Sequence, residues 1–206
     1  SNHRLGNEKP AREFAFKYLD YQFEDETSKR IIKNYMRIGR IIPEKSVELW
    51  EKAYGIASKL KQVELKESLK ALLVQKYFRM AEDLRVEKKY EASLEILQRA
   101  KLLGPSARLS YLEAIVYSNL DKLDLACEHF EQALHLAPED DNYKIAYARV
   151  LENAIFKTKD KAKKEEYIEK VKLLLSSSQD DPRKVNILNK IINLNAKYKI
   201  TNADLK

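Results

Sequence analysis

The sequence predicts an all-α fold, an α-solenoid of antiparallel helix pairs with extra N-terminal helices and a C-terminal capping helix. Three observations support this class. The 206 residues include only four Gly, three Thr and eight Val, whereas strands favour β-branched residues and the turns between them favour Gly. Apolar residues recur at helical spacing along most of the chain. The helical pattern also repeats itself, at an interval of 33 residues.

The N-terminal third is expected to hold helices without a clear repeat. Residues 1–9 are expected to be a disordered tail. Residues 10–73 are expected to form helices that pack on the first repeat, with a degenerate repeat among them as an open alternative. Residues 64–70 are expected either to form a short helix or to extend the first repeat helix.

Two helices can be placed within this N-terminal region. Thr27 or Ser28 can cap a helix over 29–40, because a hydroxyl accepts a hydrogen bond from an unpaired N–H of the first turn. Pro43 begins the next helix, which carries Trp50, since proline at the first helical position removes an N–H that would have no helical partner.

The central part of the chain contains an internal repeat. Seven apolar or small residues recur 33 residues later with the same character. Ala81, Leu84, Tyr90, Ser93, Leu97, Ala100 and Pro105 correspond to Ala114, Tyr117, Leu123, Ala126, Phe130, Ala133 and Pro138. Two of these positions recur again 34 residues on, as Ala148 and Leu151. We therefore expect three repeats, over residues 74–106, 107–140 and 141–182.

Each repeat is expected to be a pair of helices. In the first, the polar break 85–89 separates the two helices, and Gly104-Pro105 ends the second one. In the second repeat, Asp121-Lys122 forms the turn. In the third, the lysine-rich residues 157–164 displace the second helix.

After the repeats, Asp181-Pro182 is a favourable helix start, with Asp as the cap and Pro just inside. A capping helix is expected over 183–200, apolar on one face and polar on the other. Residues 201–206 are expected to be a frayed tail.

These motifs resemble the tetratricopeptide repeat family, most strongly over 74–140 and partly over 141–182. The family's unit is an antiparallel helix pair of about 34 residues, and the resemblance implies a right-handed solenoid with a concave groove for a partner's peptide or helix. Ser110 and Glu113 stand where the family has large apolar residues. We therefore expect the first helix of the second repeat to be shifted or wetter.

The resemblance implies that the first helix of each pair lines the groove. The groove-facing positions are Phe78, Glu82 and Arg85 in the first repeat, Tyr111, Ile115, Ser118 and Asn119 in the second, and Ile145, Arg149, Glu152 and Asn153 in the third. Phe78, Tyr111 and Arg149 are expected to contribute most to binding. The N-terminal helices or a second copy of the chain remain alternative occupants of this groove.

Co-chaperone members of the family hold a C-terminal carboxylate with Lys, Asn and Arg at particular groove positions. Here those positions carry Phe78 and Glu82, then Arg108 and Leu112, then Asn142 and Ala146. The carboxylate clamp is therefore absent, and we reject binding of a chaperone's acidic tail.

The formal net charge is +7 and is unevenly distributed. Residues 1–103 carry +6, residues 104–140 carry −5 and residues 141–206 carry +6. Arg30, Lys33, Arg37 and Arg40 form a basic stripe at helical spacing. With the lysines of 157–172, this stripe suggests an alternative function, binding to nucleic acid or to an anionic membrane surface. The acidic middle and the excess of Lys over Arg disfavour nucleic acid and favour ordinary solvated helix faces.

No pattern indicates catalysis, a metal site or a cofactor. The glycines are isolated, so no phosphate-binding loop is present. His129 and His135 are six residues apart and do not share a helix face for a metal.

The single cysteine, Cys127, is expected to pack as a small apolar side chain. No apolar run is long enough to span a membrane. Because the chain begins at Ser1, we expect a processed end or the boundary of a longer chain.

The sequence thus predicts a non-enzymatic module that binds another protein through the concave face, with self-association as a further possibility. An accessory domain of an enzyme is a third hypothesis.

Overall fold

The structure is a computed structural model that describes residues 25–176 and 181–203. All regular secondary structure in these two ranges is helical, which confirms the predicted all-α class. The expected tail 1–9 and the aromatic-rich stretch 10–23 lie outside the described residues, as do the last three residues of the chain.

The chain divides into two compact units, 1–76 and 77–206, and the division falls within one long helix. The first unit contains α2 (Asp25–Ile41), the 3₁₀ turn η1 (Pro43–Lys45), α3 (Ser46–Lys59) and the first half of α4 (Val63–Val86). Residues 64–70 therefore extend the first repeat helix instead of forming a separate short helix.

In the first unit, α2 and α3 pack closely through a glycine. Gly39 is buried against Trp50, and a Cβ atom built on Gly39 would lie 2.3 Å from the Nε1 atom of that indole. The same Nε1 donates a hydrogen bond of 3.2 Å to the carbonyl of Met36. Ile32 of α2 and Ala53 of α3 have no solvent exposure. This contact allows the two helix backbones to approach closely.

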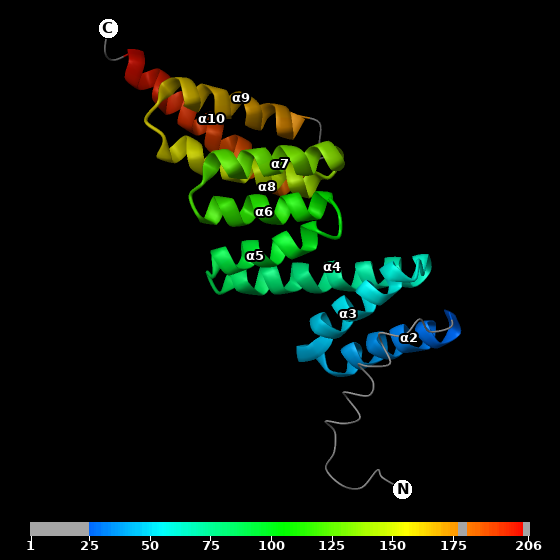
Figure 1. Ribbon diagram of the computed structural model, residues 1–206. Coiled ribbons are helices and arrows are strands. Elements are labelled where there is room, and N and C mark those ends of the chain that lie inside the picture. Colours follow the sequence, from blue (N-terminus) through cyan, green and yellow to red (C-terminus); the bar gives the residue numbers. More distant parts are fainter. Residues whose placement is uncertain (1–24, 177–180, 204–206) are drawn as a thin grey trace, which may run out of the picture. The chain divides into compact units, whose positions relative to one another are not determined.

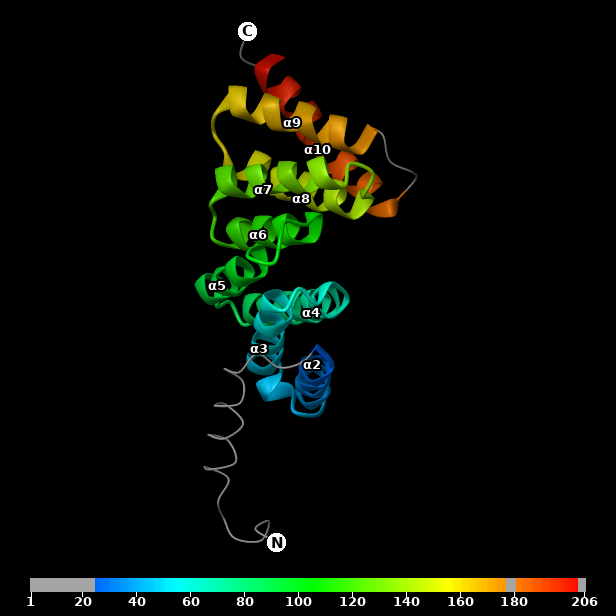
Figure 2. The ribbon, with the colours of Figure 1, turned by 45° about the vertical axis from the view of Figure 1, so that its right-hand side comes forward.

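The second unit is a succession of antiparallel helix pairs (Figures 1 and 2). The end of α4 pairs with α5 (Tyr90–Lys101), α6 (Ala107–Asn119) with α7 (Leu123–Leu136), and α8 (Asp141–Lys157) with α9 (Lys161–Ser176). Helix α10 (Pro182–Ala203) packs on α8 and α9. It continues to Ala203, so residues 201–203 belong to the helix and not to the expected frayed tail.

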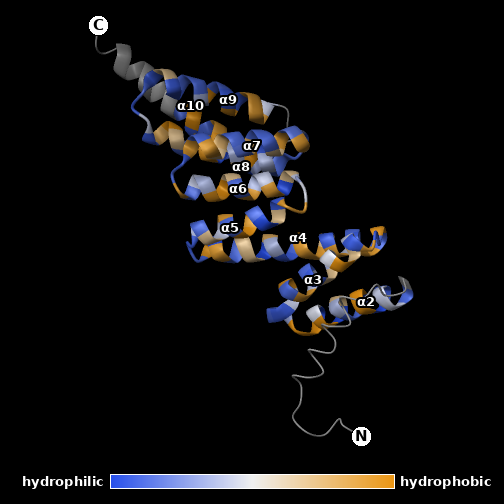
Figure 3. Cartoon of the chain, viewed as in Figure 1, coloured by the Kyte–Doolittle hydropathy of each residue, from blue (hydrophilic) through white to orange (hydrophobic). Residues whose placement is uncertain are grey.

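Small residues lie at the close helix contacts of this unit. Ala81, Ala114 and Ala148 have at most 1% of their surface exposed. Between α4 and α5, the Ser93 hydroxyl donates a 2.8 Å hydrogen bond to the carbonyl of Ala81. Every helix of the unit carries both hydrophobic and hydrophilic positions (Figure 3), as expected for helices that bury one face.

Helix boundaries follow local chemistry. Ser106 caps α6, accepting a hydrogen bond from the Leu109 N–H. Asp181 caps α10 by accepting from the Arg183 N–H, at 2.8 Å. Gly104 has a φ angle of 128° after the end of α5, a conformation that glycine adopts at little cost.

Turn residues elsewhere adopt positive φ without being glycine. They are Lys61, Lys88 and Asp121, with φ angles of 53°, 62° and 54°. Each follows the end of a helix, which is the position where glycine is normally preferred.

The lysine-rich residues 157–164 displace α9, the second helix of the third pair, along the sequence relative to the regular repeat interval. Helix α8 has 17 residues where α6 has 13. As a result, α9 begins 38 residues after α7, whereas α7 begins 33 residues after α5. The helix pair itself is retained.

Candidate partner-binding surface

The predicted groove positions lie on the first helices of the three pairs, which touch one another through side chains. We call the solvent-facing residues of α4 from 77 onward, α6 and α8 the first-helix face. Arg108 of α6 reaches α4, where its guanidinium lies 3.7 Å from the carboxylate of Glu82. Tyr111 of α6 stacks on Tyr143 of α8, with ring centroids 4.8 Å apart.

Two predicted groove residues are buried and belong to the core. Phe78 has 5% of its surface exposed, and the Arg108 guanidinium lies over its ring at 5.4 Å from the centroid. Ile145 is 3% exposed within the hydrophobic core of α7, α8, α9 and α10. Neither side chain can be a contact residue in this arrangement, so we leave both out of the candidate surface. Glu152, also named as groove-facing, is buried and paired with Lys190 at 2.8 Å.

Tyr111 is half-buried and already has two aromatic partners. Besides stacking on Tyr143, it meets Phe130 edge-on, with centroids 6.1 Å apart. Desolvation raises the pKa of the Tyr111 hydroxyl above its ordinary value. The ring thus serves chiefly to join the second and third helix pairs, leaving only part of it for a ligand.

The remaining positions are accessible. Asn119, Arg149 and Asn153 are exposed, and Glu82, Arg85, Ile115 and Ser118 are half-buried. The structure brings Asn119 and Asn153 together on one cavity of about 1130 Å³.

This cavity, which we call the hairpin pocket, lies where the C-terminal ends of α6 and α8 meet the starts of α7 and α9. Phe156 lines it with 52% of its surface exposed, together with Leu125, Tyr167 and charged residues of the turns. The sequence reasoning missed Phe156 because the groove positions were carried only as far as Asn153. Phe156 follows Asn153 by three residues and so shares its helix face, and the greater length of α8 was the available signal.

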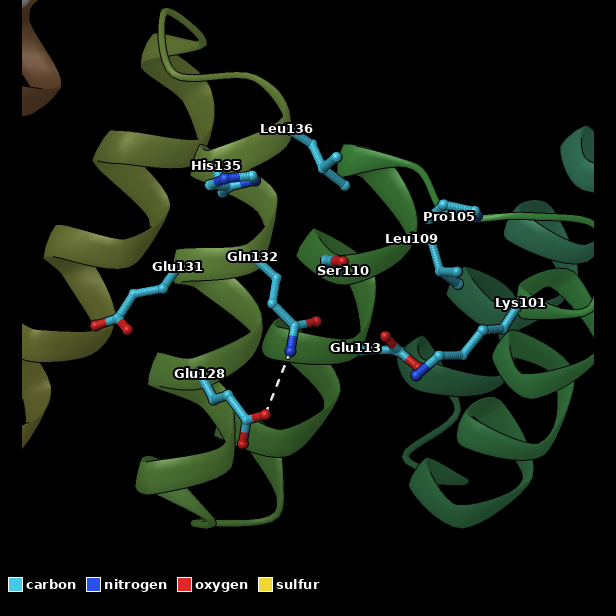
Figure 4. A pocket seen from close by; sticks show the side chains of 10 residues that line it. All are labelled: Lys101, Pro105, Leu109, Ser110, Glu113, Glu128, Glu131, Gln132, His135 and Leu136. Carbon is cyan, nitrogen blue, oxygen red and sulfur yellow. Dashed lines mark hydrogen bonds between the residues drawn. The ribbon is translucent and has the colours of Figure 1, made fainter.

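A second cavity, of about 530 Å³, lies between α5, α6 and α7; we call it the interhelix pocket (Figure 4). Its α6 wall contains Leu109, Ser110 and Glu113, and Figure 4 shows Lys101 across the pocket from the α7 residues Glu128 and Gln132. Ser110 and Glu113 border this cavity but are only 7% and 5% exposed, so the expectation of a wetter helix is not confirmed.

The internal repeat explains this interhelix pocket. Glu113 is aligned 34 residues before Tyr147, and Tyr147 stacks on Phe130 of α7 at 4.9 Å, filling the corresponding space between the second and third pairs. Glu113 cannot fill space in this way. The Glu113 side chain is 7% exposed, and its carboxylate lies 3.1 Å from the Nδ1 atom of His129, which has no hydrogen-bond partner among the described residues.

The predicted basic stripe is a solvent-facing feature of the first unit. Arg30, Lys33, Arg37 and Arg40 are all exposed on α2. None of the four forms an ion pair with another residue that the structure describes.

The other candidate chemical groups lack a reactive environment. Burial raises the pKa of the Cys127 thiol, which disfavours the nucleophilic thiolate. Within residues 25–176 and 181–203, no three His, Cys, Asp or Glu side chains are grouped so as to hold a metal ion. A search of the same residues finds no helix that is both long and apolar enough to cross a membrane.

Comparison with known proteins does not assign this chain to a family. No protein-family model matches the sequence, and no curated protein matches it. One similar solved structure is the crystal structure of MamA, which is 18% identical, with 76% of this chain and 95% of that chain covered and a TM-score of 0.45. This chain is a helical-repeat protein. We rest that conclusion on its own helix pairs and internal repeat, because a likeness at this level carries no independent weight.

Proposed function

We propose that this chain is a non-enzymatic scaffold of the tetratricopeptide type, which binds a segment of a partner protein across its first-helix face. The observation that carries the proposal is the meeting of Asn119, Asn153 and Phe156 at the hairpin pocket. Two of these three residues were selected from the sequence as partner-binding positions.

The chemistry of the hairpin pocket suits a peptide segment with an apolar anchor. Phe156 and Leu125 offer exposed apolar surface, and burying such surface provides most of the free energy in peptide recognition. The two asparagine side chains offer amide donors and acceptors that can fix the direction of a partner backbone. Arg149 adds an exposed cation one helical turn before Asn153.

The experiment begins by finding the segment. A photoreactive phenylalanine analogue replaces Phe156, and a matched protein carries it at Leu102, which is 87% exposed at the end of α5. We expect the Phe156 position to cross-link one partner segment that the Leu102 position does not. Equal cross-linking from both positions would contradict the proposal.

The affinity for that segment is then compared by calorimetry between the wild type and the Arg149→Ala/Asn153→Ala variant. Both side chains are exposed, so the fold should be unaffected, and we expect affinity to fall about tenfold, as for loss of roughly 1.4 kcal/mol of contacts. Gln98→Ala/Arg99→Ala on α5 removes the same side-chain types and is the matched control. Tyr111→Ala is a poorer variant, because it also breaks the stack with Tyr143. If the first variant binds as tightly as the control, the first-helix face is not the site.

A further inference from the structure

Helix α7 carries an acidic stripe on its exposed face. Asp124, Glu128 and Glu131 follow at spacings of four and three residues, which places them on one side of the helix. Glu131 is already engaged, since it accepts hydrogen bonds from the Tyr147 hydroxyl and from Lys170. Asp124 and Glu128 form no ion pair with any residue in the described ranges. Their charges are therefore available to an external partner.

The acidic stripe borders the interhelix pocket. Glu128 and Glu131 both line it, and so does Leu136, which is 49% exposed on the same helix. Figure 4 shows the Glu128 and Glu131 side chains on α7, and Leu136 on the side of Pro105 and Leu109. This surface thus combines negative charge with an apolar hollow.

Helix α2 has the complementary surface. Its basic stripe follows spacings of three, four and three residues, from Arg30 to Arg40, and spans about 15 Å at the helical rise. Ile41, with 70% of its surface exposed, lies on the same face as Arg37, four residues away. The buried side of α2 carries Ile32, Met36 and Gly39, so the stripe and Ile41 point away from the unit's own core.

We propose that this chain associates with a second copy of itself, the basic stripe of α2 in one copy docking on the acidic stripe of α7 in the other. Ile41 supplies the apolar anchor for the interhelix pocket, and Arg30 and Arg37 face Asp124 and Glu128. The contact is heterologous, because the two surfaces differ. Each copy keeps one free basic stripe or acidic stripe after pairing, so further copies can be added to the assembly. Because Asp124 also lines the hairpin pocket, this contact reaches the edge of the surface proposed for a partner.

The area of the contact determines the affinity expected between two copies. Stable complexes bury about 800 Å² on each partner, which one helix laid along another does not reach. Association is therefore weak and concentration-dependent. Since exposed charges supply much of it, salt weakens it: we expect at least a tenfold loss of affinity between about 50 and about 500 mM NaCl.

Charge reversal allows a decisive test. Sedimentation velocity is recorded for the wild type, for Arg30→Glu/Arg37→Glu and for Asp124→Lys/Glu128→Lys, over concentrations from about 10 µM to about 1 mM. We expect the wild type to associate and each variant alone to remain monomeric. An equimolar mixture of the two variants should associate again, because each now carries the charge that the other requires.

Glu91→Lys/Glu95→Lys is the matched control for the acidic variant, since both residues are exposed on α5 at the same four-residue spacing. It should associate like the wild type, and far-UV circular dichroism should be the same for all variants. A monomeric wild type, a control that also dissociates, or a mixture that stays monomeric would each overturn the proposal. So would a wild type that remains monomeric but binds a single-stranded RNA 20-mer through Arg30 and Arg37, since the stripe would then serve a nucleic acid.

Discussion

Replacing Gly39 by alanine should destabilise the first unit, although alanine is the better helix former. The new methyl carbon would lie 2.3, 2.8 and 2.9 Å from the Nε1, Cδ1 and Cε2 atoms of Trp50. Carbon contacts are optimal at about 3.5–4.0 Å, so the indole must move by roughly 1 Å. The Trp50 side chain is only 8% exposed, and its Nε1 atom donates a hydrogen bond of 3.2 Å to the Met36 carbonyl. The indole therefore has little freedom to move.

The size of the destabilisation by Gly39→Ala can be estimated from three free-energy contributions. Overpacking costs about 1–3 kcal/mol, and loss of the indole hydrogen bond costs about 1 kcal/mol. The higher helix propensity of alanine offsets at most about 1 kcal/mol of this loss of stability. We therefore expect Gly39→Ala to lower the free energy of unfolding by about 1–3 kcal/mol. Gly55→Ala is the control, because a Cβ there has nothing within 4 Å. It should raise the free energy of unfolding by about 0.5–1 kcal/mol.

The protein contains a single tryptophan, Trp50, so its fluorescence during urea unfolding reports on the first unit. Far-UV circular dichroism reports on all helices in parallel. The comparison is then repeated in a Trp50→Leu background by circular dichroism, where the clash is absent and the Gly39→Ala penalty should disappear. If Gly39→Ala proves as stable as the wild type, or if its penalty persists without the indole, the close-contact explanation is refuted.

Three further predictions concern the second unit. Lys88→Gly should raise the free energy of unfolding by up to about 1 kcal/mol, because glycine relieves the positive φ of 62°; a Lys88→Val variant that is no less stable than the wild type in urea unfolding would contradict this. Lys190→Met should lower stability by about 1–2 kcal/mol, since it leaves the buried Glu152 carboxylate without its 2.8 Å partner, and Glu152→Gln in the same background should recover part of the loss. The pKa of the Asp181 carboxyl is lowered, chiefly by a hydrogen bond from the Arg183 side chain, so this interaction stabilises α10 above the ordinary pKa of aspartate and is lost as the pH falls through the lowered value. Carboxyl NMR titration should show a higher Asp181 pKa in Arg183→Gln, and an unchanged pKa would exclude Arg183 as the cause.

Local sequence signals located several helix boundaries, but the cap expected at Thr27 or Ser28 was wrong, because both residues lie inside α2, which the structure describes from Asp25. Gly104-Pro105 and Asp181-Pro182 act on the adjacent backbone alone, so they could be interpreted without tertiary information. The repeat spacing likewise placed Ala81, Ala114 and Ala148 at equivalent positions, and all three are buried. Within the candidate surface, Asn119, Arg149 and Asn153 are exposed as expected.

Errors arose where a non-local partner decided the outcome. Phe78 and Arg108 are 30 residues apart in the sequence, and helical periodicity cannot show that the guanidinium covers the ring. Gly39 gave no turn or cap signal, because its role depends on Trp50 of the next helix. Phe156 became a candidate only when the lengths of α8 and α6 were known.

The sequence by itself therefore determined the fold class, the order of the helices and the positions of the small residues, since these depend on composition, local capping and a regular interval. Only the tertiary structure decided which side chains on each helix face are covered and where space remains. The interhelix pocket illustrates the difference. The sequence shows Ser110 and Glu113 in place of larger apolar side chains, but the space beside them depends on how closely three helices pack. Packing is set by contacts between residues far apart in the chain, which no single segment encodes.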